Sequence, residues 1–69
     1  MERRHRMVLN ETMQAIESEE DKYGKLILIE RLEKNLLGKA SKEEFDWAIE
    51  YLEEHCAIYN PKEGYILKF

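Results

Sequence analysis

Residues suited to a buried face recur at three- and four-residue steps near the start of the chain. Within residues 3–19 the recurring positions are His5, Leu9, Thr12, Met13 and Ile16. Because an α-helix brings such positions onto one side, the spacing predicts an amphipathic helix over residues 3–19. The polar run that follows closes with Gly24, a residue type that is common just beyond a helix end.

The segment LILIERLEKNLL, residues 26–37, has two interpretations at its start. Its first residues fit a short strand, whereas its later apolar residues recur at helical steps, and periodicity alone does not separate the two. We expect a brief extended segment near residues 24–27 and a helix over residues 28–37.

A third helix is predicted over residues 42–55. The sequence SKEE before it is a capping box: the Ser41 hydroxyl accepts a backbone N–H of the first turn, and the Glu44 carboxylate accepts the N–H of Ser41. One narrow arc of this helix is expected to face the core, and it contains Phe45, Ala48, Ile49, Leu52 and Cys56. We interpret Cys56 as a small core residue at the helix end.

Two β-rich runs close the chain and are joined by a short loop. Pro61 presets the backbone of this loop, and Gly64 can adopt the left-handed conformation that closes it. We predict antiparallel strands over residues 57–60 and 65–69. A lone hairpin is marginal in water, so these strands must pack on the helices.

The order helix, short strand, helix, turn, helix and hairpin is typical of a winged helix-turn-helix domain. This is a mainly α (α+β) fold with three helices and a C-terminal β-hairpin wing. We expect a single winged-helix domain over residues 1–69, with residues 1–6 as a basic arm that can be disordered. The predicted core contains Leu9, Met13, Ile16, Ile29, Leu32, Leu36, Phe45, Ile49, Leu52 and Ile58.

The composition fits a small domain with little apolar area to spare, since 43% of the 69 residues are hydrophobic and 38% are charged. The one cysteine excludes an internal disulfide and indicates a reducing compartment. No apolar run approaches the roughly 18–20 residues that cross a bilayer, and the basic start lacks the apolar region of a signal peptide. We expect a cytoplasmic protein without membrane contact.

The net charge of −4 is unevenly distributed, because residues 41–56 contain six carboxylates and one lysine. In helix-turn-helix proteins the second helix of the motif enters the major groove, where phosphates would repel such a face. We therefore expect at most a weak DNA contact, made by basic residues elsewhere: Arg3, Arg4, Arg6, Lys62 and Lys68. The alternative for the three arginines is a solvated chain terminus.

The final segment, FDWAIEYLEEHCAIYNPKEGYILKF, resembles the end of the winged-helix domain at the C-terminus of archaeal minichromosome-maintenance (MCM) replicative helicases. The residues that carry the resemblance are Leu52, Ile58, Tyr59, Pro61, Gly64 and Tyr65. The family usually has glycine where this chain has Cys56. The resemblance implies a regulatory or docking module of a DNA-replication machine, without the ATPase of the helicase.

No arrangement of residues indicates catalysis. The sequence contains neither G-x-x-x-x-G-K-[ST] nor G-x-G-x-x-G, and its helical carboxylates follow one outer face instead of pairing in an apolar pocket. His55 and Cys56 are adjacent, so they diverge by about 100° around a helix and do not suit one metal ion. We expect no enzymatic activity, no cofactor and no metal site.

Trp47, Tyr51 and His55 follow one another at four-residue steps on the third helix, away from its core face. One interpretation is that these rings pack on the first helix or the wing and widen the core. The other is that they form a half-exposed stripe for protein docking or dimerisation.

These observations predict a non-enzymatic interaction or regulatory module in a nucleic-acid process, with DNA replication as its setting. It would act through a protein partner or a second copy of itself, with at most weak DNA binding. The alternative is a free-standing, dimeric DNA-binding transcription regulator.

Overall fold

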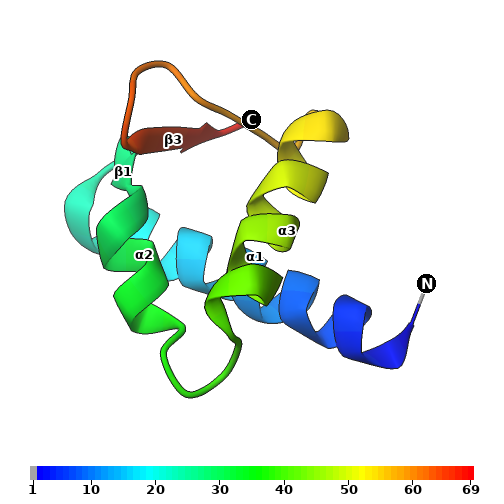
Figure 1. Cartoon of the computed structure of the whole chain (residues 1–69). Coiled ribbons are helices and arrows are strands. Elements are labelled where there is room, and N and C mark those ends of the chain that lie inside the picture. The colour runs from blue at the N-terminus through cyan, green and yellow to red at the C-terminus, as the bar shows by residue number, and fades with distance from the viewer. Residues whose placement is uncertain (1) are drawn as a thin grey trace.

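The structure of the chain is a computed structural model that describes residues 2–69. In chain order, the elements within these residues are α1 (Arg3–Tyr23), β1 (Ile27–Leu28), α2 (Ile29–Asn35), α3 (Lys42–Glu54), β2 (Ile58–Tyr59) and β3 (Tyr65–Lys68). Figure 1 shows α2 on the left and α3 on the right, with α1 passing below and behind them and β3 at the top. The predicted mixed α+β class, with three helices and an antiparallel pairing near the C-terminus, is confirmed.

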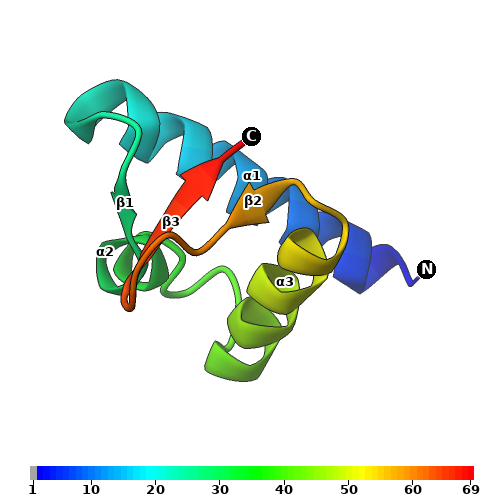
Figure 2. The same cartoon turned by 90° about the horizontal axis from the view of Figure 1, so that it is seen from above.

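The sheet has three strands in the order β1-β3-β2, and both pairings are antiparallel. Figure 2 shows β3 between its two neighbours, with α1 behind the sheet. Ile27 pairs with Ile66, so the extended segment before α2 joins the hairpin. The prediction of a two-stranded hairpin was therefore incomplete, and the extended segment lies later than residues 24–27. The free edge of β3 supplies the hydrogen bonds that draw β1 into the sheet.

Helix α1 continues past its predicted end at residue 19 and stops at Tyr23. The polar residues beyond 19 are helical, and Glu19 itself lies on the buried face of α1, only 4% exposed. Gly24 ends the helix with φ 99°, and its N–H donates to the Glu20 carbonyl over 2.9 Å. Gly24 therefore marks the end of the helix, and the predicted end at residue 19 was wrong.

Helix α2 is shorter than predicted and ends at Asn35 instead of residue 37. The chain turns tightly after it, because the N–H of Leu37 donates to the Lys34 carbonyl and that of Lys39 donates to the Leu36 carbonyl. Gly38, with φ 85°, lies within this turn. The turn positions Ser41 at the start of α3.

Helix α3 has the predicted capping box. The backbone N–H of Glu44 donates to the Ser41 hydroxyl over 3.1 Å, and the N–H of Ser41 donates to the Glu44 carboxylate over 2.9 Å. Since both free N–H groups find acceptors, the helix begins where the sequence predicted.

The C-terminus of α3 contradicts the core assignment of Cys56, whose side chain is exposed. Cys56 has φ 59°, and its N–H donates to the Glu53 carbonyl over 3.1 Å. The next N–H, that of Ala57, donates to the Leu52 carbonyl over 2.9 Å. These two bonds and the left-handed residue form a Schellman motif, which turns the chain toward β2. Because α3 ends at Glu54, the arc of core-facing helical positions does not extend to Cys56.

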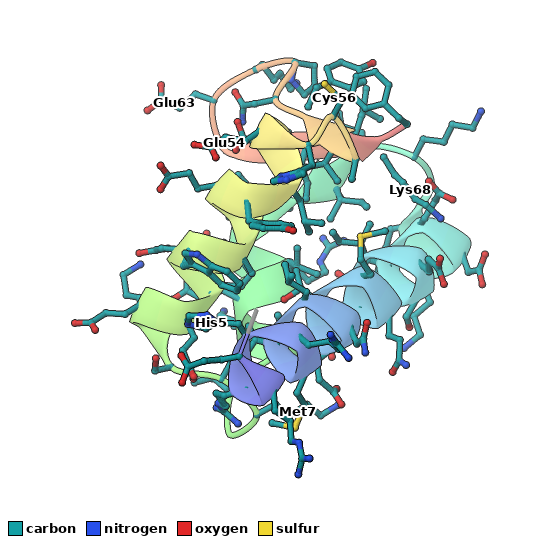
Figure 3. All side chains as sticks on the ribbon, turned by 90° about the vertical axis from the view of Figure 1, so that its right-hand side faces the viewer. His5, Met7, Glu54, Cys56, Glu63 and Lys68 are labelled. Atoms are coloured by element: carbon teal, nitrogen blue, oxygen red, sulfur yellow. The ribbon has the colours of Figure 1, made fainter. Side chains whose placement is uncertain are left out.

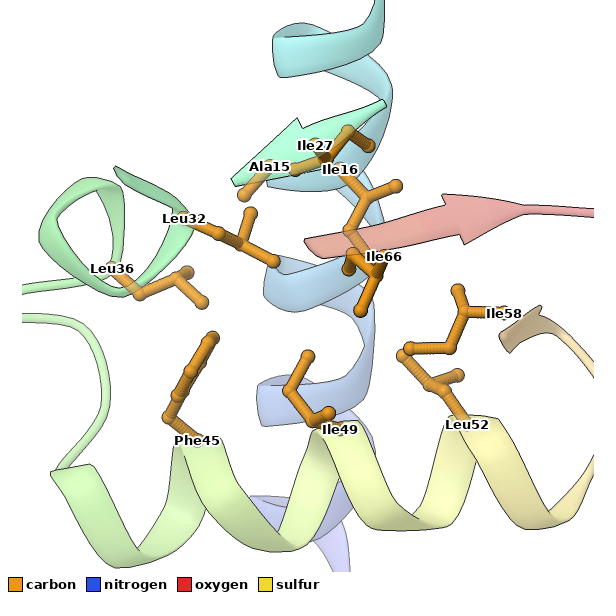
Figure 4. Packing of buried hydrophobic residues seen from close by; sticks show 10 residues of the cluster. All are labelled: Ala15, Ile16, Ile27, Leu32, Leu36, Phe45, Ile49, Leu52, Ile58 and Ile66. Atoms are coloured by element: carbon orange, nitrogen blue, oxygen red, sulfur yellow. The ribbon is translucent and has the colours of Figure 1, made fainter. Parts of the chain in front are cut away.

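One hydrophobic core lies between the helices and the sheet (Figure 4). Its cluster consists of Ala15, Ile16, Ile27, Leu32, Leu36, Phe45, Ile49, Leu52, Ile58 and Ile66. Seven of the ten predicted core residues belong to it, whereas Leu9, Met13 and Ile29 are half-buried at its edge. Ile27 was not predicted because it lies on the two-residue strand β1, which is defined by its pairing with β3, whereas Ile66 lies on a predicted strand but was left out of the predicted core.

Candidate functional site

Helix α3 presents two different flanks beside its buried face. Its buried residues are Phe45, Ala48, Ile49 and Leu52. At about 100° per residue, Trp47, Tyr51 and His55 fall on one flank and the exposed carboxylates fall on the outer face and the other flank. The aromatic flank meets α1, since the Trp47 ring contacts that of His5.

Four rings form a continuous stack, which we call the aromatic column: His5, Trp47, Tyr51 and His55. The centroids of His5 and Trp47 are 4.2 Å apart, those of Trp47 and Tyr51 are 5.4 Å apart, and those of Tyr51 and His55 are 4.0 Å apart. His55 Nδ1 lies 2.9 Å from the carbonyl oxygen of Tyr51, so an N–H at this position can donate to it. This contact fixes the His55 end of the column.

The column combines features of both interpretations given above. Trp47 and Tyr51 are half-buried, and His55 is exposed. The contact with His5 of α1 is the packing expected if the rings widen the core. The remaining exposed ring surface is what a docking contact requires. His5 was not predicted as a member, because its contact with Trp47 joins residues that are far apart in the sequence.

Arg4 is bound within the molecule. Its Nε and Nη2 donate to the two carboxylate oxygens of Glu44 over 2.6 and 2.7 Å, and Nη2 also donates to the Lys39 carbonyl over 3.1 Å. These hydrogen bonds raise the pKa of Arg4. The bond from Arg4, with that from the Ser41 backbone, lowers the pKa of Glu44 to about 2. Arg4 thus ties the start of α1 to the start of α3.

Arg3 and Arg6 lie on the exposed side of the same helical turn. No carboxylate within residues 2–69 forms an ion pair with either. Of the three N-terminal arginines, these two therefore have guanidinium groups available to an external anion.

The two predicted lysines of the wing also differ. Lys68 Nζ donates to Glu17 of α1 over 3.0 Å, and this bond raises the pKa of Lys68. Lys62 is exposed, with its Nζ 4.6 Å from the centroid of the Tyr65 ring. The loop that carries Lys62 and the start of α1 lie at opposite ends of the molecule (Figures 1 and 2). The five predicted cations therefore do not form one basic patch.

No family model, curated protein or solved structure matches this chain. Within residues 2–69, no three His, Cys, Asp or Glu side chains are grouped so that they could hold a metal ion. A search of the same residues finds no helix that is both long and apolar enough to span a membrane. The candidate site therefore rests on the geometry of α3 and its neighbours.

Proposed function

We propose that the chain is a winged-helix module that acts through protein contacts in a nucleic-acid process and has no enzymatic activity. The order α1-β1-α2-α3-β2-β3 and the sheet order β1-β3-β2 support this fold assignment. In it, α2 and α3 are the helix-turn-helix and the loop between β2 and β3 is the wing. The resemblance to the MCM C-terminal domain suggests DNA replication as the setting.

The charge of α3 is the observation that carries this proposal. The helix that would enter a major groove presents five exposed carboxylates and one lysine: Glu43, Asp46, Glu50, Glu53, Glu54 and Lys42. Phosphates would be repelled along this surface, since affinity for DNA depends largely on contacts between cations and phosphates. Arg4 and Lys68 already bind carboxylates of the same chain. Protein contacts are therefore favoured over insertion of α3 into DNA.

An NMR titration of the chain with nonspecific duplex DNA, at low and moderate salt, tests this proposal. We expect small, salt-sensitive shifts of the Arg3, Arg6 and Lys62 amides and none along α3. Charge reversal in Lys62→Glu should weaken the contact, whereas neutralising Glu50 and Glu54 should strengthen it. Nanomolar, sequence-specific binding that is lost on mutating α3 would contradict the proposal and favour the dimeric transcription regulator.

A further inference from the structure

A groove of about 340 Å³ lies beside α3 on the flank opposite the aromatic column. Its apolar lining comes from Ile29 at the start of α2 and from Phe45 and Ile49 of α3. Its other lining residues are all acidic: Asp46, Glu50, Glu53 and Glu54. We call it the acid-rimmed groove.

Cations of the same chain neutralise little of the negative charge of the rim. Lys42 Nζ lies 3.8 Å from Asp46, but no cation within residues 2–69 pairs with Glu50, Glu53 or Glu54. Carboxylates three and four residues apart on a helix repel one another. In Figure 3 Glu54 and Glu63 lie on one side of the molecule and Lys68 on the other. The groove therefore combines apolar surface with unneutralised negative charge. An occupant that is both apolar and basic would bury the apolar surface and neutralise the charge.

We propose that the acid-rimmed groove binds a basic, amphipathic helical segment of a partner protein. An apolar side chain of that segment would contact Ile29 and Ile49, while its lysines or arginines would face Glu50 and Glu54. The rim extends from Asp46 to Glu54, a rise of about 12 Å along α3, which equals roughly two turns of a docked helix. This inference rests on the proposed protein-interaction function and names the chemical class of the partner.

Two other occupants fit less well. Duplex DNA is excluded by the sign of the rim. A second copy of this chain could offer the exposed Arg3, Arg6 and Met7 of α1. However, Figure 3 shows Met7 and Glu54 at opposite ends of the molecule. A two-fold dimer buries the same patch of both copies, so a reciprocal contact would need these two surfaces side by side.

The probe is a fluorescein-labelled amphipathic peptide of about four helical turns, with leucines at i, i+3, i+4 and i+7 and lysine or arginine between them. We expect micromolar binding that weakens at high salt. The variant Glu50→Gln/Glu54→Gln should weaken it by about 3- to 10-fold. The control Glu20→Gln/Asp21→Asn removes the same charge from α1 and should leave it unchanged. A peptide with the same residues in scrambled order controls for charge alone.

Amide shifts locate the peptide on the chain. Shifts at Ile29 and Ile49, together with the loss caused by the rim variant, support the groove. Equal weakening by both double variants, or an equal affinity of the scrambled peptide, would show nonspecific attraction and overturn the inference. Shifts at these residues that depend on the concentration of the chain alone would assign the groove to a second copy and overturn the partner assignment. Tight DNA binding by α3 would instead overturn the proposed function itself.

Discussion

Replacing Cys56 by glycine should stabilise the protein. Cys56 lies at the position after α3 where the chain must adopt a left-handed conformation, and its φ is 59°. Its exposed side chain contributes little to the core. A residue with a Cβ is therefore held in a backbone conformation that glycine adopts without strain.

The expected gain follows from two opposing contributions. A left-handed conformation costs a residue with a Cβ roughly 1–2 kcal/mol. Glycine avoids this cost but gives the unfolded chain more freedom, which offsets about 0.4–1 kcal/mol. The net stabilisation of Cys56→Gly should be about 0.5–1 kcal/mol. For a domain of this size it corresponds to a rise in Tm of about 3–6 °C.

Urea denaturation and thermal unfolding, both followed by circular dichroism, measure this change. Cys56→Ala is the matched control: it removes the thiol but keeps the Cβ, so its stability should stay within about 0.5 kcal/mol of the native chain. Gly38→Ala should have the opposite effect and destabilise the protein by about 1 kcal/mol, because Gly38 has φ 85°. The cost is that of the backbone conformation alone, since a Cβ there would meet no atom within 4 Å. If the glycine variant is no more stable than the alanine variant, the left-handed assignment at position 56 is wrong.

Three further changes test the core, the pairing of the helices and the aromatic column. Leu52→Ala should lower the free energy of unfolding, measured by urea denaturation, by about 2–5 kcal/mol. Leu9→Ala should lower it clearly less, because Leu9 is half-buried, and equal losses would contradict the burial pattern. Because folding lowers the pKa of Glu44 from 4.5 to about 2, its stabilising contribution is complete above pH 4.5 and is lost as the pH falls toward 2. The stability difference between the native chain and Glu44→Gln should therefore shrink over this range, and a constant difference would refute the ion pair. Trp47→Ala should leave a folded chain but abolish a dimer or partner complex that forms through the aromatic column, as measured by sedimentation velocity, whereas unfolding of this variant would make the column part of the core.

Local signals explain why most of the fold could be predicted from the sequence. The capping box at Ser41, the helical spacing of Phe45 and Leu52, and the turn ending at Gly64 each lie within a few neighbouring residues. The parts of the fold that were not predicted depend on contacts between distant segments of the chain. Strand β1 has two residues and exists because β3 offers it a free edge. The extended part of α1 likewise contacts a distant segment, since the Arg31 guanidinium of α2 lies 4.0 Å from the centroid of the Tyr23 ring.

The same division applies to the candidate site. Four-residue spacing was sufficient to place Trp47, Tyr51 and His55 in one line. It could not reveal that His5 would extend the stack. We also predicted from the sequence that Arg4 could contact DNA, but the Arg4 guanidinium binds Glu44. A count of charges cannot distinguish a paired arginine from an unpaired one, because the pairing is decided by how α1 packs against α3.

The two flanks of α3 allow one partner or two, and a double-mutant cycle distinguishes these cases. Tyr51 belongs to the aromatic column and Glu53 to the acid-rimmed groove, and two residues apart they lie on nearly opposite sides of the helix. If separate partners occupy them, the effects of Tyr51→Ala and Glu53→Gln on peptide binding should be independent, since uncoupled sites add within about 0.5 kcal/mol. A single partner that wraps around α3 would contact both flanks, and its binding would show a coupling larger than this. Independence would show that the aromatic column and the acid-rimmed groove are separate binding surfaces of α3, which is the arrangement expected of a helix that acts through protein contacts.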